Sequence, residues 1–350
     1  MIYDLNGLAE VVMDLPIELR CLVHGLPLNG ESALACSQGC HIPVIRNVPR
    51  FVQSSKYASA FGLQWNAFRK TQLDSYTGTT ISKVRLTRCF GGSLEIVRGK
   101  SVLEVGCGAG RFTELLLSAG ARVFASDLSE AVEANYENCH HWPGYFVCQA
   151  DGRQLPVAPH SFDFVLCIGV IQHTPSPEET IAALARYVKP GGMLVLDHYH
   201  QGYAQNFLQR NLRRVLIRLP ARIANSITLL LARTLLRLHR LTWTNRRGTR
   251  RLRALLLKHS PFLDYHDLFP ELGDKLITEW SILDTHDALT DYYKHLRTRE
   301  QIEACLAAIG LTDLEVTYGG NGIEARARMP AVGISESDDE IGNSLAVGMG

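Results

Sequence analysis

The sequence has little that would place the protein outside the cell or across a membrane. Its 350 residues include nine cysteines, an odd and scattered set unlike the paired framework of a secreted disulfide-rich domain. The first residues include Asp4, Glu10 and Asp14 and lack the basic-then-apolar order of a signal peptide. The apolar run 227–236 is too short to span a bilayer. These absences predict a cytoplasmic protein.

Acidic residues are absent between Asp197 and Asp264. Thirteen arginines and one lysine lie in that segment, although the net charge of the whole chain is only +1. Leucines recur among the arginines at steps of three and four residues, which predicts two or three amphipathic helices broken near Pro220 and Gly248. Nucleic acid is not expected as a partner, because no binding motif and few aromatic residues accompany the arginines.

Three uses of this basic insertion, residues 201–263, remain open at this stage. It can be a helical cap with a solvated basic face, because long charged side chains pack well on such a surface. Residues 205–258 can instead contact anionic lipid, peripherally at the inner face of the membrane. The arginines can also bind a phosphorylated or nucleotide-linked molecule through bidentate pairing.

A glycine-rich turn follows a strongly apolar strand. Residues 102–112 read VLEVGCGAGRF, and an apolar helix pattern follows at once. Glycine is needed where backbone turns tightly or approaches a ligand closely, and a strand-to-helix turn directs N–H groups into the crevice. The Gly-x-Gly-x-Gly spacing of Gly106, Gly108 and Gly110 differs from the Gly-x-Gly-x-x-Gly of dinucleotide binders.

Four further segments follow this turn in order. A strand at 121–126 ends at Asp127, where an acid in a doubly wound sheet reaches a ribose diol. Residues 147–152 read VCQADG, and an apolar strand begins at 162 and leads into a turn that ends at His173. Residues 184–197 read as helix, glycine turn and strand.

Together these segments resemble the class I S-adenosylmethionine-dependent methyltransferases. The resemblance implies an α/β fold with a doubly wound, seven-stranded, mostly parallel sheet formed by residues 99–200 and 298–330. It implies S-adenosylmethionine as the cofactor and Asp151 as the acceptor of the adenine amino group. The cofactor-binding residues that it implies are Glu104, Gly106, Gly108, Gly110, Asp127, Leu128, Asp151, Gly152 and Ile168.

Residues 1–52 contain cysteines and histidines at metal-ligand spacing. Cys21-x-x-His24 precedes Cys36-x-x-x-Cys40, and four such ligands suit tetrahedral zinc. The region resembles the zinc-ribbon module that precedes many bacterial methyltransferase cores. It departs from that pattern because His24 stands where a second cysteine is usual, and because three residues separate the second pair. His41 competes with Cys40 as the last ligand, and the alternative is a ribbon that has lost its metal.

The remaining segments fit around this core. Residues 53–98 are predicted to form a helical lid or linker, because Tyr57, Phe61, Trp65 and Phe68 recur at helical spacing. Residues 264–297 resemble the active-site cover of the same subgroup. Thr298 is predicted to cap the last core helix, and a closing hairpin follows it. Residues 331–350 are predicted to be a disordered tail.

Three histidines are candidate bases. A sulfonium donor needs no acid to protonate its leaving group, so the protein has to orient the nucleophile and, for a hydroxyl, remove a proton. His173 follows the fourth strand and His198 follows the fifth. His286 lies in the cover segment beside Asp287, which is a further candidate. The alternative role for His173 is to brace the cofactor loop.

The resemblance implies methyl transfer to a small or carrier-linked acceptor, such as one joined to a sugar, lipid or nucleotide. O-methylation in glycan or natural-product biosynthesis is the first expectation, and N- or C-methylation of another metabolite is the alternative. A catalytically idle fold that binds a membrane surface or a partner is a third possibility. The presence of Glu104, Asp127 and Asp151 argues against an idle fold. The sequence predicts no oligomeric state.

Overall fold

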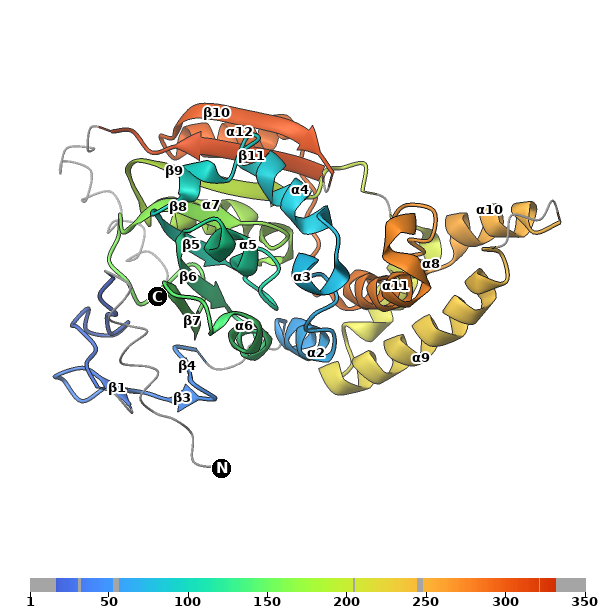
Figure 1. Cartoon of the computed structure of the whole chain (residues 1–350), viewed down its shortest axis with the longest axis horizontal. Coiled ribbons are helices and arrows are strands. Elements are labelled where there is room, and N and C mark those ends of the chain that lie inside the picture. The colour runs from blue at the N-terminus through green and yellow to red at the C-terminus, as the bar shows by residue number, and fades with distance from the viewer. Residues whose placement is uncertain are drawn as a thin grey trace, which may run out of the picture.

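The computed structural model describes residues 17–30, 33–52, 57–203, 205–243, 248–320 and 322–331. Its centre is a seven-stranded sheet in the order β10-β11-β9-β8-β5-β6-β7 (Figure 1). The strands are β5 (Ser101–Val105), β6 (Arg122–Asp127), β7 (Tyr145–Gln149), β8 (Phe162–Cys167), β9 (Val188–His198), β10 (Thr312–Gly319) and β11 (Gly322–Arg328). Only β11 runs antiparallel to its neighbours, so the predicted doubly wound, mostly parallel sheet is confirmed.

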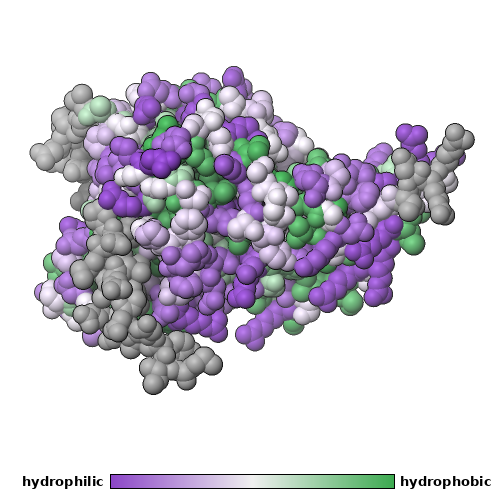
Figure 2. Space-filling view, in the orientation of Figure 1, coloured by the Kyte–Doolittle hydropathy of each residue, from purple (hydrophilic) through white to green (hydrophobic). Residues whose placement is uncertain are grey.

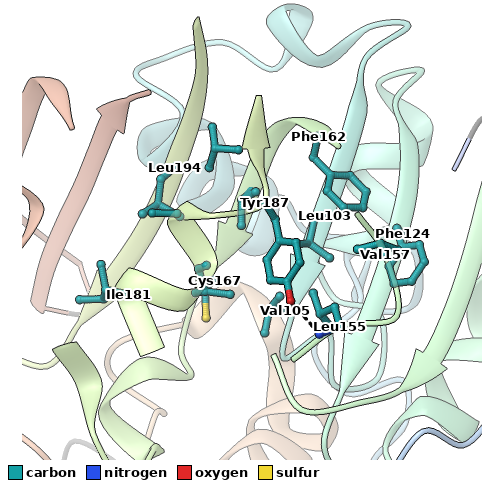
Figure 3. Close-up of a cluster of buried hydrophobic side chains, with 14 of the residues drawn as sticks. Leu103, Val105, Phe124, Leu155, Val157, Phe162, Cys167, Ile181, Tyr187 and Leu194 are labelled. Carbon is teal, nitrogen blue, oxygen red and sulfur yellow. Dashed lines mark hydrogen bonds between the residues drawn. The ribbon is translucent and has the colours of Figure 1, made fainter. Parts of the chain in front are cut away.

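Side chains of alternating strand positions enter two separate cores. Leu103 of β5 packs with Phe124, Phe162 and Ile181 on the face covered by α7 (Pro177–Ala185) and α12 (Arg299–Ala308). Figure 3 shows this cluster, in which the Leu155 amide also donates to the Tyr187 hydroxyl oxygen at 2.8 Å. Val102 faces the opposite core, under α4 (Ile81–Cys89), α5 (Thr113–Ser118) and α6 (Val132–Cys139). Such burial on both faces explains the near-continuous apolar strands of the sequence.

Helix α12 begins where the sequence predicts. The Thr298 side chain accepts from the Gln301 amide, and the Gln301 side chain accepts from the Thr298 amide, which completes a capping box. The hairpin of β10 and β11 then closes the sheet against β9.

The N-terminal module consists of short two-stranded ribbons beside the β7 edge of the sheet (Figure 1). One ribbon pairs β1 (Leu34–Ala35) with β2 (His41–Ile42), and the other pairs β3 (Val44–Ile45) with β4 (Val48–Pro49). Arg50 attaches the module to the core, because its guanidinium donates to Gln149 at 3.0 Å and to Glu133 at 2.9 Å.

Helices beyond the core form a second body that extends away from the sheet (Figure 1). It comprises α8 (Phe207–Leu216), α9 (Ala221–Arg240), α10 (Arg250–His259), the short η3 (Pro270–Leu272) and α11 (Gly273–Thr290). The chain breaks between α8 and α9 beside Pro220, and between α9 and α10 beside Gly248, as predicted. Along the sequence, α2 (Ser59–Ala67), α3 (Asp74–Thr77) and η1 (Glu95–Val97) come between the ribbons and β5, and α2 lies beside α9 and α11 (Figure 1). Residues 332–350, the predicted tail, lie outside the described residues.

Candidate active site

A cavity lies at the carboxyl ends of β5 and β8, where the strand order reverses. Gly106 and Gly108 form part of its wall, with positive φ angles of 77° and 50°. A Cβ atom at Gly106 would lie 2.2 Å from a methyl carbon of Val170. Glycine is therefore required here by both backbone conformation and space.

Asp127 holds this glycine turn in place. One carboxylate oxygen accepts from the Gly108 amide at 3.0 Å, and the other accepts from the Ser129 amide and hydroxyl at 2.8 and 2.7 Å. Burial raises the pKa of Asp127, whereas these donors oppose the shift. Asp127 and Leu128 both line the cavity, as the resemblance implies.

Asp151, Gly152 and Ile168 also line the cavity, from the ends of β7 and β8. The Asp151 carboxylate pairs with the Arg153 guanidinium at 2.6 Å. A ligand amino group at Asp151 would share the carboxylate with this arginine. Seven of the nine predicted cofactor residues thus lie around one cavity.

The structure corrects two predicted cofactor contacts. The Glu104 side chain is buried and accepts from the Thr113 hydroxyl at 2.6 Å, so it tethers the start of α5 and does not line the cavity. Burial raises the pKa of this carboxyl to about 8. Gly110 faces α6, where an added Cβ would lie 2.9 Å from the Cys139 sulfur. Both residues therefore pack against neighbouring helices and do not contact the cavity.

Of the predicted catalytic histidines, only His173 lines the cavity. Its Nδ1 atom lies 3.0 Å from the Tyr293 carbonyl oxygen, and its ring packs against Phe61 and Tyr199. Because a carbonyl only accepts, Nδ1 carries the hydrogen and Nε2 keeps a lone pair. Burial lowers the pKa of His173, which favours this neutral form.

His198 and His286 do not line the cavity, which corrects their predicted catalytic role. His198 is fully buried, and its Nδ1 bonds the Tyr199 carbonyl at 2.8 Å. His198 pairs with Ile323 of β11 at the end of β9. Because successive side chains of a strand point to opposite faces of the sheet, the His198 side chain points away from the cavity. His286 lies behind the wall, with Nδ1 2.9 Å from the Gln64 side-chain oxygen.

Another end of the cavity is lined by residues of which the sequence singled out only Asp287, as a further candidate base. They come from five segments of the chain and comprise Arg85, Arg111, Tyr199, Tyr203, Tyr265, Asp284 and Asp287. Tyr199 and Tyr203 stack at 4.2 Å between ring centroids. The spacing of Asp284 and Asp287 on a helix was the available signal, because residues three apart share a face.

The two arginines at this end differ in their partners. Arg85 pairs with the buried Asp197 at 2.5 Å. Arg111 donates to the Ser82 hydroxyl and the Gln72 side-chain oxygen, both at 2.8 Å, and has no carboxylate within 4 Å among the described residues. Burial, with the nearby Arg85 charge, lowers the pKa of Arg111 to about 9.

A sequence profile described as a methyltransferase domain matches residues 103–196, which carry these cavity turns. Ubiquinone biosynthesis O-methyltransferase of Coxiella burnetii is 33% identical over 110 residues, which cover 31% of this chain and 47% of that protein. The corresponding Pseudomonas paraeruginosa protein is 38% identical over 105 residues, with coverage of 28% and 44%. The chain thus spans about half the length of these curated relatives.

Solved structures similar to the methyltransferase domain and its surroundings include enzymes with different acceptors. Phosphoethanolamine N-methyltransferase 2 of Haemonchus contortus, in complex with S-adenosyl-L-methionine, is 18% identical with a TM-score of 0.39 and coverage of 68% and 38%. The CurJ carbon methyltransferase is 16% identical with a TM-score of 0.40 and coverage of 75% and 57%. The seven-stranded sheet has the strand order of the class I methyltransferase fold that the sequence predicts.

A second cluster lies in the N-terminal module, away from the methyltransferase domain's cavity. The ligand atoms of Cys21, His24, Cys36 and Cys40 all lie within 4.8 Å of one another. His24 Nδ1 is 3.8 Å from the Cys21 sulfur and 3.5 Å from the sulfurs of Cys36 and Cys40. The exposed His41 is not part of this cluster. The structure thus brings together the four residues selected for metal binding.

Proposed function

We propose that the protein transfers the methyl group of S-adenosylmethionine to a hydroxyl of a small or carrier-linked acceptor. The observation that carries the proposal is the single cavity that joins the donor turn at Gly106–Gly108 to the aromatic and acidic end near Asp287. Donor and acceptor can meet there without intervening water, which is the main requirement for in-line displacement at a sulfonium methyl. The O-methyltransferase names of the curated relatives support a hydroxyl acceptor.

The proposed role of His173 is to orient the groups at the junction of the two ends. Its Nδ1 hydrogen bond to Tyr293 fixes the ring between Phe61 and Tyr199. Glycan or natural-product acceptors remain within this proposal, as does N- or C-methylation of another metabolite. The described arginines of residues 205–243 and 248–258 do not line the cavity, so they give no support to direct binding of a phosphorylated acceptor.

Calorimetry with S-adenosylmethionine tests the donor half of the proposal. We expect a single binding site whose affinity falls about 100-fold when Asp127 is replaced by alanine. Absence of heat with the intact protein would exclude methyl transfer and favour the idle fold. Product profiling with methyl-labelled donor then distinguishes an O-, N- or C-methylated product.

We further propose that the basic insertion rests on anionic lipid. Exposed apolar residues of α9 form one row, at Ile223, Ile227, Leu230, Leu238 and the adjoining Leu241. Their spacing of four, three, eight and three residues keeps them on one side of the helix. The buried residues Ala224, Thr228, Ala232 and Leu236 lie on the opposite side.

Arginines accompany this apolar row. Arg222, Arg233 and Arg237 are exposed, and no carboxylate lies within ion-pair distance of them in the described parts of the chain. Figure 2 shows apolar patches among hydrophilic side chains on the extended part of the molecule. None of the described helices has the length and apolarity needed to cross a bilayer. An apolar row flanked by arginines suits a helix that lies in the headgroup layer.

Vesicle flotation tests this surface at single residues. We expect Leu230→Asp to reduce binding to phosphatidylglycerol vesicles about tenfold, because it places a charge in the apolar row. Ile96→Asp is the matched control, since Ile96 is also exposed (41%) but lies on η1, outside the basic insertion. Equal flotation of both variants and the parent would exclude the lipid contact and leave the solvated cap.

We also propose that the N-terminal cluster holds structural zinc. Bonds of about 2.0 Å to nitrogen and about 2.3 Å to sulfur would place tetrahedral ligands about 3.5 Å apart. The His24 distances of 3.5 to 3.8 Å fit this geometry. Such a metal would join two turns of a module with little core of its own.

Metal analysis of the purified protein tests the zinc site. We expect one zinc per chain in the parent and in Cys305→Ser, which changes a thiol outside the cluster. We expect Cys36→Ser to lose most of the zinc. Equal metal content in the parent and in Cys36→Ser would contradict the assignment and favour a ribbon that has lost its metal.

A further inference from the structure

The acidic end of the cavity contains two carboxylates that differ in their partners. Asp284 accepts from the Gln72 amide nitrogen and from the Trp280 indole nitrogen, both at 3.1 Å. It also shares a hydrogen bond with the Tyr265 hydroxyl. Both oxygens of Asp284 are therefore held by the protein.

Asp287, one helical turn further along α11, is held by no such partner. It lines the same cavity, and its carboxylate has no hydrogen bond or ion pair with any of the described residues. The other two cavity carboxylates are already engaged, because Asp127 binds the glycine turn and Asp151 binds Arg153. Asp287 is thus the carboxylate of the cavity that is available to a second substrate.

Helix geometry explains why Asp287 reaches the cavity and its neighbour His286 does not. Successive residues of a helix turn by about 100°, so positions 284 and 287 share a face whereas position 286 faces elsewhere. His286 accordingly contacts Gln64 and Thr290. Of the two neighbouring candidates in the predicted cover segment, Asp287 lines the cavity and His286 does not.

The charges around Asp287 come from three directions. On its own helix and just beyond are Asp284, Asp291 and Lys294, and Arg213 extends from α8. Tyr199 and Tyr203 face it from the segment after β9, and Tyr265 from the loop before η3. Burial and the charge of Asp291 raise the pKa of Asp287 to about 7. A base of that pKa is half ionised near neutral pH and can both take and release a proton.

Aromatic rings line the same part of the cavity. The stacked Tyr199 and Tyr203 rings, with Tyr265 and Phe112, give flat walls. Aromatic walls beside an available carboxylate favour a planar ring over a flexible chain.

We propose that the acceptor is a planar, hydroxyl-bearing ring and that the Asp287 carboxylate removes its hydroxyl proton. This inference rests on the proposed methyl transfer and adds the substrate class and the base. The acceptor oxygen forms a bond to the methyl carbon while the methyl–sulfur bond breaks, and that electron pair remains on sulfur. The proton passes to Asp287, which becomes a neutral carboxylic acid and returns the proton to water after product release.

Methyl transfer to catechol from labelled S-adenosylmethionine provides the test. We expect the intact protein to methylate catechol, and Asp287→Asn to lower kcat about 100-fold because general-base catalysis contributes on that order. The affinity for S-adenosylmethionine is expected to stay within about threefold, because Asp287 lies at the acceptor end. In the intact protein kcat should rise with pH through about 7, since the ionised carboxylate is the active form, and Asp287→Asn should lose that dependence.

Two controls separate the base from simple damage to the fold. Asp274→Asn makes the same change on an exposed residue in the first turn of α11 and should leave kcat unchanged. Asp287→Glu should restore part of the rate and the pH dependence. Full kcat in Asp287→Asn, or loss of the pH dependence in His173→Gln instead, would overturn the assignment of the base.

Benzylamine, a ring of similar size that bears an amine, tests the substrate class. Methylation of benzylamine without methylation of catechol would overturn the hydroxyl acceptor and make Asp287 an ammonium-binding residue. Binding of S-adenosylmethionine with no transfer to catechol would overturn the inferred ring acceptor while leaving donor binding intact. Failure to bind the donor at all would instead refute the proposed function.

Discussion

The donor and acceptor ends of the cavity are built in different ways. The donor end comes from turns that directly follow β5, β6, β7 and β8, so neighbouring residues in sequence remain neighbours in space. The acceptor end joins α4, the segment after β9, the loop before η3 and α11, which are separated by up to about two hundred residues in sequence. Local motifs can therefore specify the donor, whereas the acceptor depends on how distant segments pack.

The largest expected effect is at the donor end. Asp127→Ala removes the acceptor for the Gly108 and Ser129 amides, and we expect the affinity for S-adenosylmethionine to fall about 100-fold, because bonds to a charged group contribute about 1.5–3 kcal/mol each. Calorimetry would measure the loss. Glu137→Ala, an exposed change on α6, is the control. Equal affinities would mean that the turn keeps its shape without Asp127.

Gly110→Ala tests whether the third motif glycine serves packing alone. Its φ of 97° and the nearby Cys139 sulfur should lower the free energy of unfolding by about 2 kcal/mol, with little change in donor affinity for the folded protein. Chemical denaturation would report the loss. Gly99→Ala has a φ of 70° and no atom within 4 Å of the new Cβ, so it isolates the backbone strain. A loss of affinity for S-adenosylmethionine in Gly110→Ala but not in Gly99→Ala would show that Gly110 takes part in cofactor binding after all.

Glu104→Gln tests the motif acid through pH. The folded-state pKa of Glu104 is raised from 4.5 to about 8, so the folded protein binds a proton that the unfolded chain has lost. Its contribution to stability therefore falls by up to about 1.4 kcal/mol per pH unit between these values. Denaturation from pH 5 to 8 should show this decline in the parent and a smaller one in Glu104→Gln. Identical slopes would show that Glu104 does not change its protonation on folding.

His198→Gln should have the smallest effect. His198 is buried outside the cavity, so we expect a loss of stability of roughly 1 kcal/mol and unchanged methyl transfer to catechol. Thermal denaturation and the transfer assay would measure the two quantities. A large loss of transfer at full stability would make His198 part of the reaction after all.

Much of the fold could be predicted because its signals are local. The strand-turn-helix units, the capping box at Thr298 and the breaks at Pro220 and Gly248 depend on residues a few positions apart. Seven of the nine residues predicted to bind the cofactor line the cavity. It assigned Glu104 and Gly110 to the ligand because a linear motif does not distinguish the wall of a cavity from the layer behind it.

The acceptor end could not be predicted from the same information. Histidine chemistry drew attention to His198 and His286, but strand pairing and helix rotation direct both away from the cavity. Asp284, Asp287 and Tyr265 become a group only when α11 and the loop before η3 reach the core. The rotation of one helix thus decides which titratable residue faces the substrate.

One contact makes the basic insertion inseparable from the chemistry of the cavity. The Arg213 guanidinium of α8 donates to Asp291 at 2.5 Å, and Asp291 lies one turn along from Asp287. Removal of residues 205–258 would take away this cation and change the protonation of the carboxylate beside the substrate. A truncated protein that failed to turn over would therefore say nothing about membranes. The insertion thus affects the protonation of Asp287 as well as any contact with a membrane. Only single-residue changes on its outer face can test membrane contact without changing that protonation.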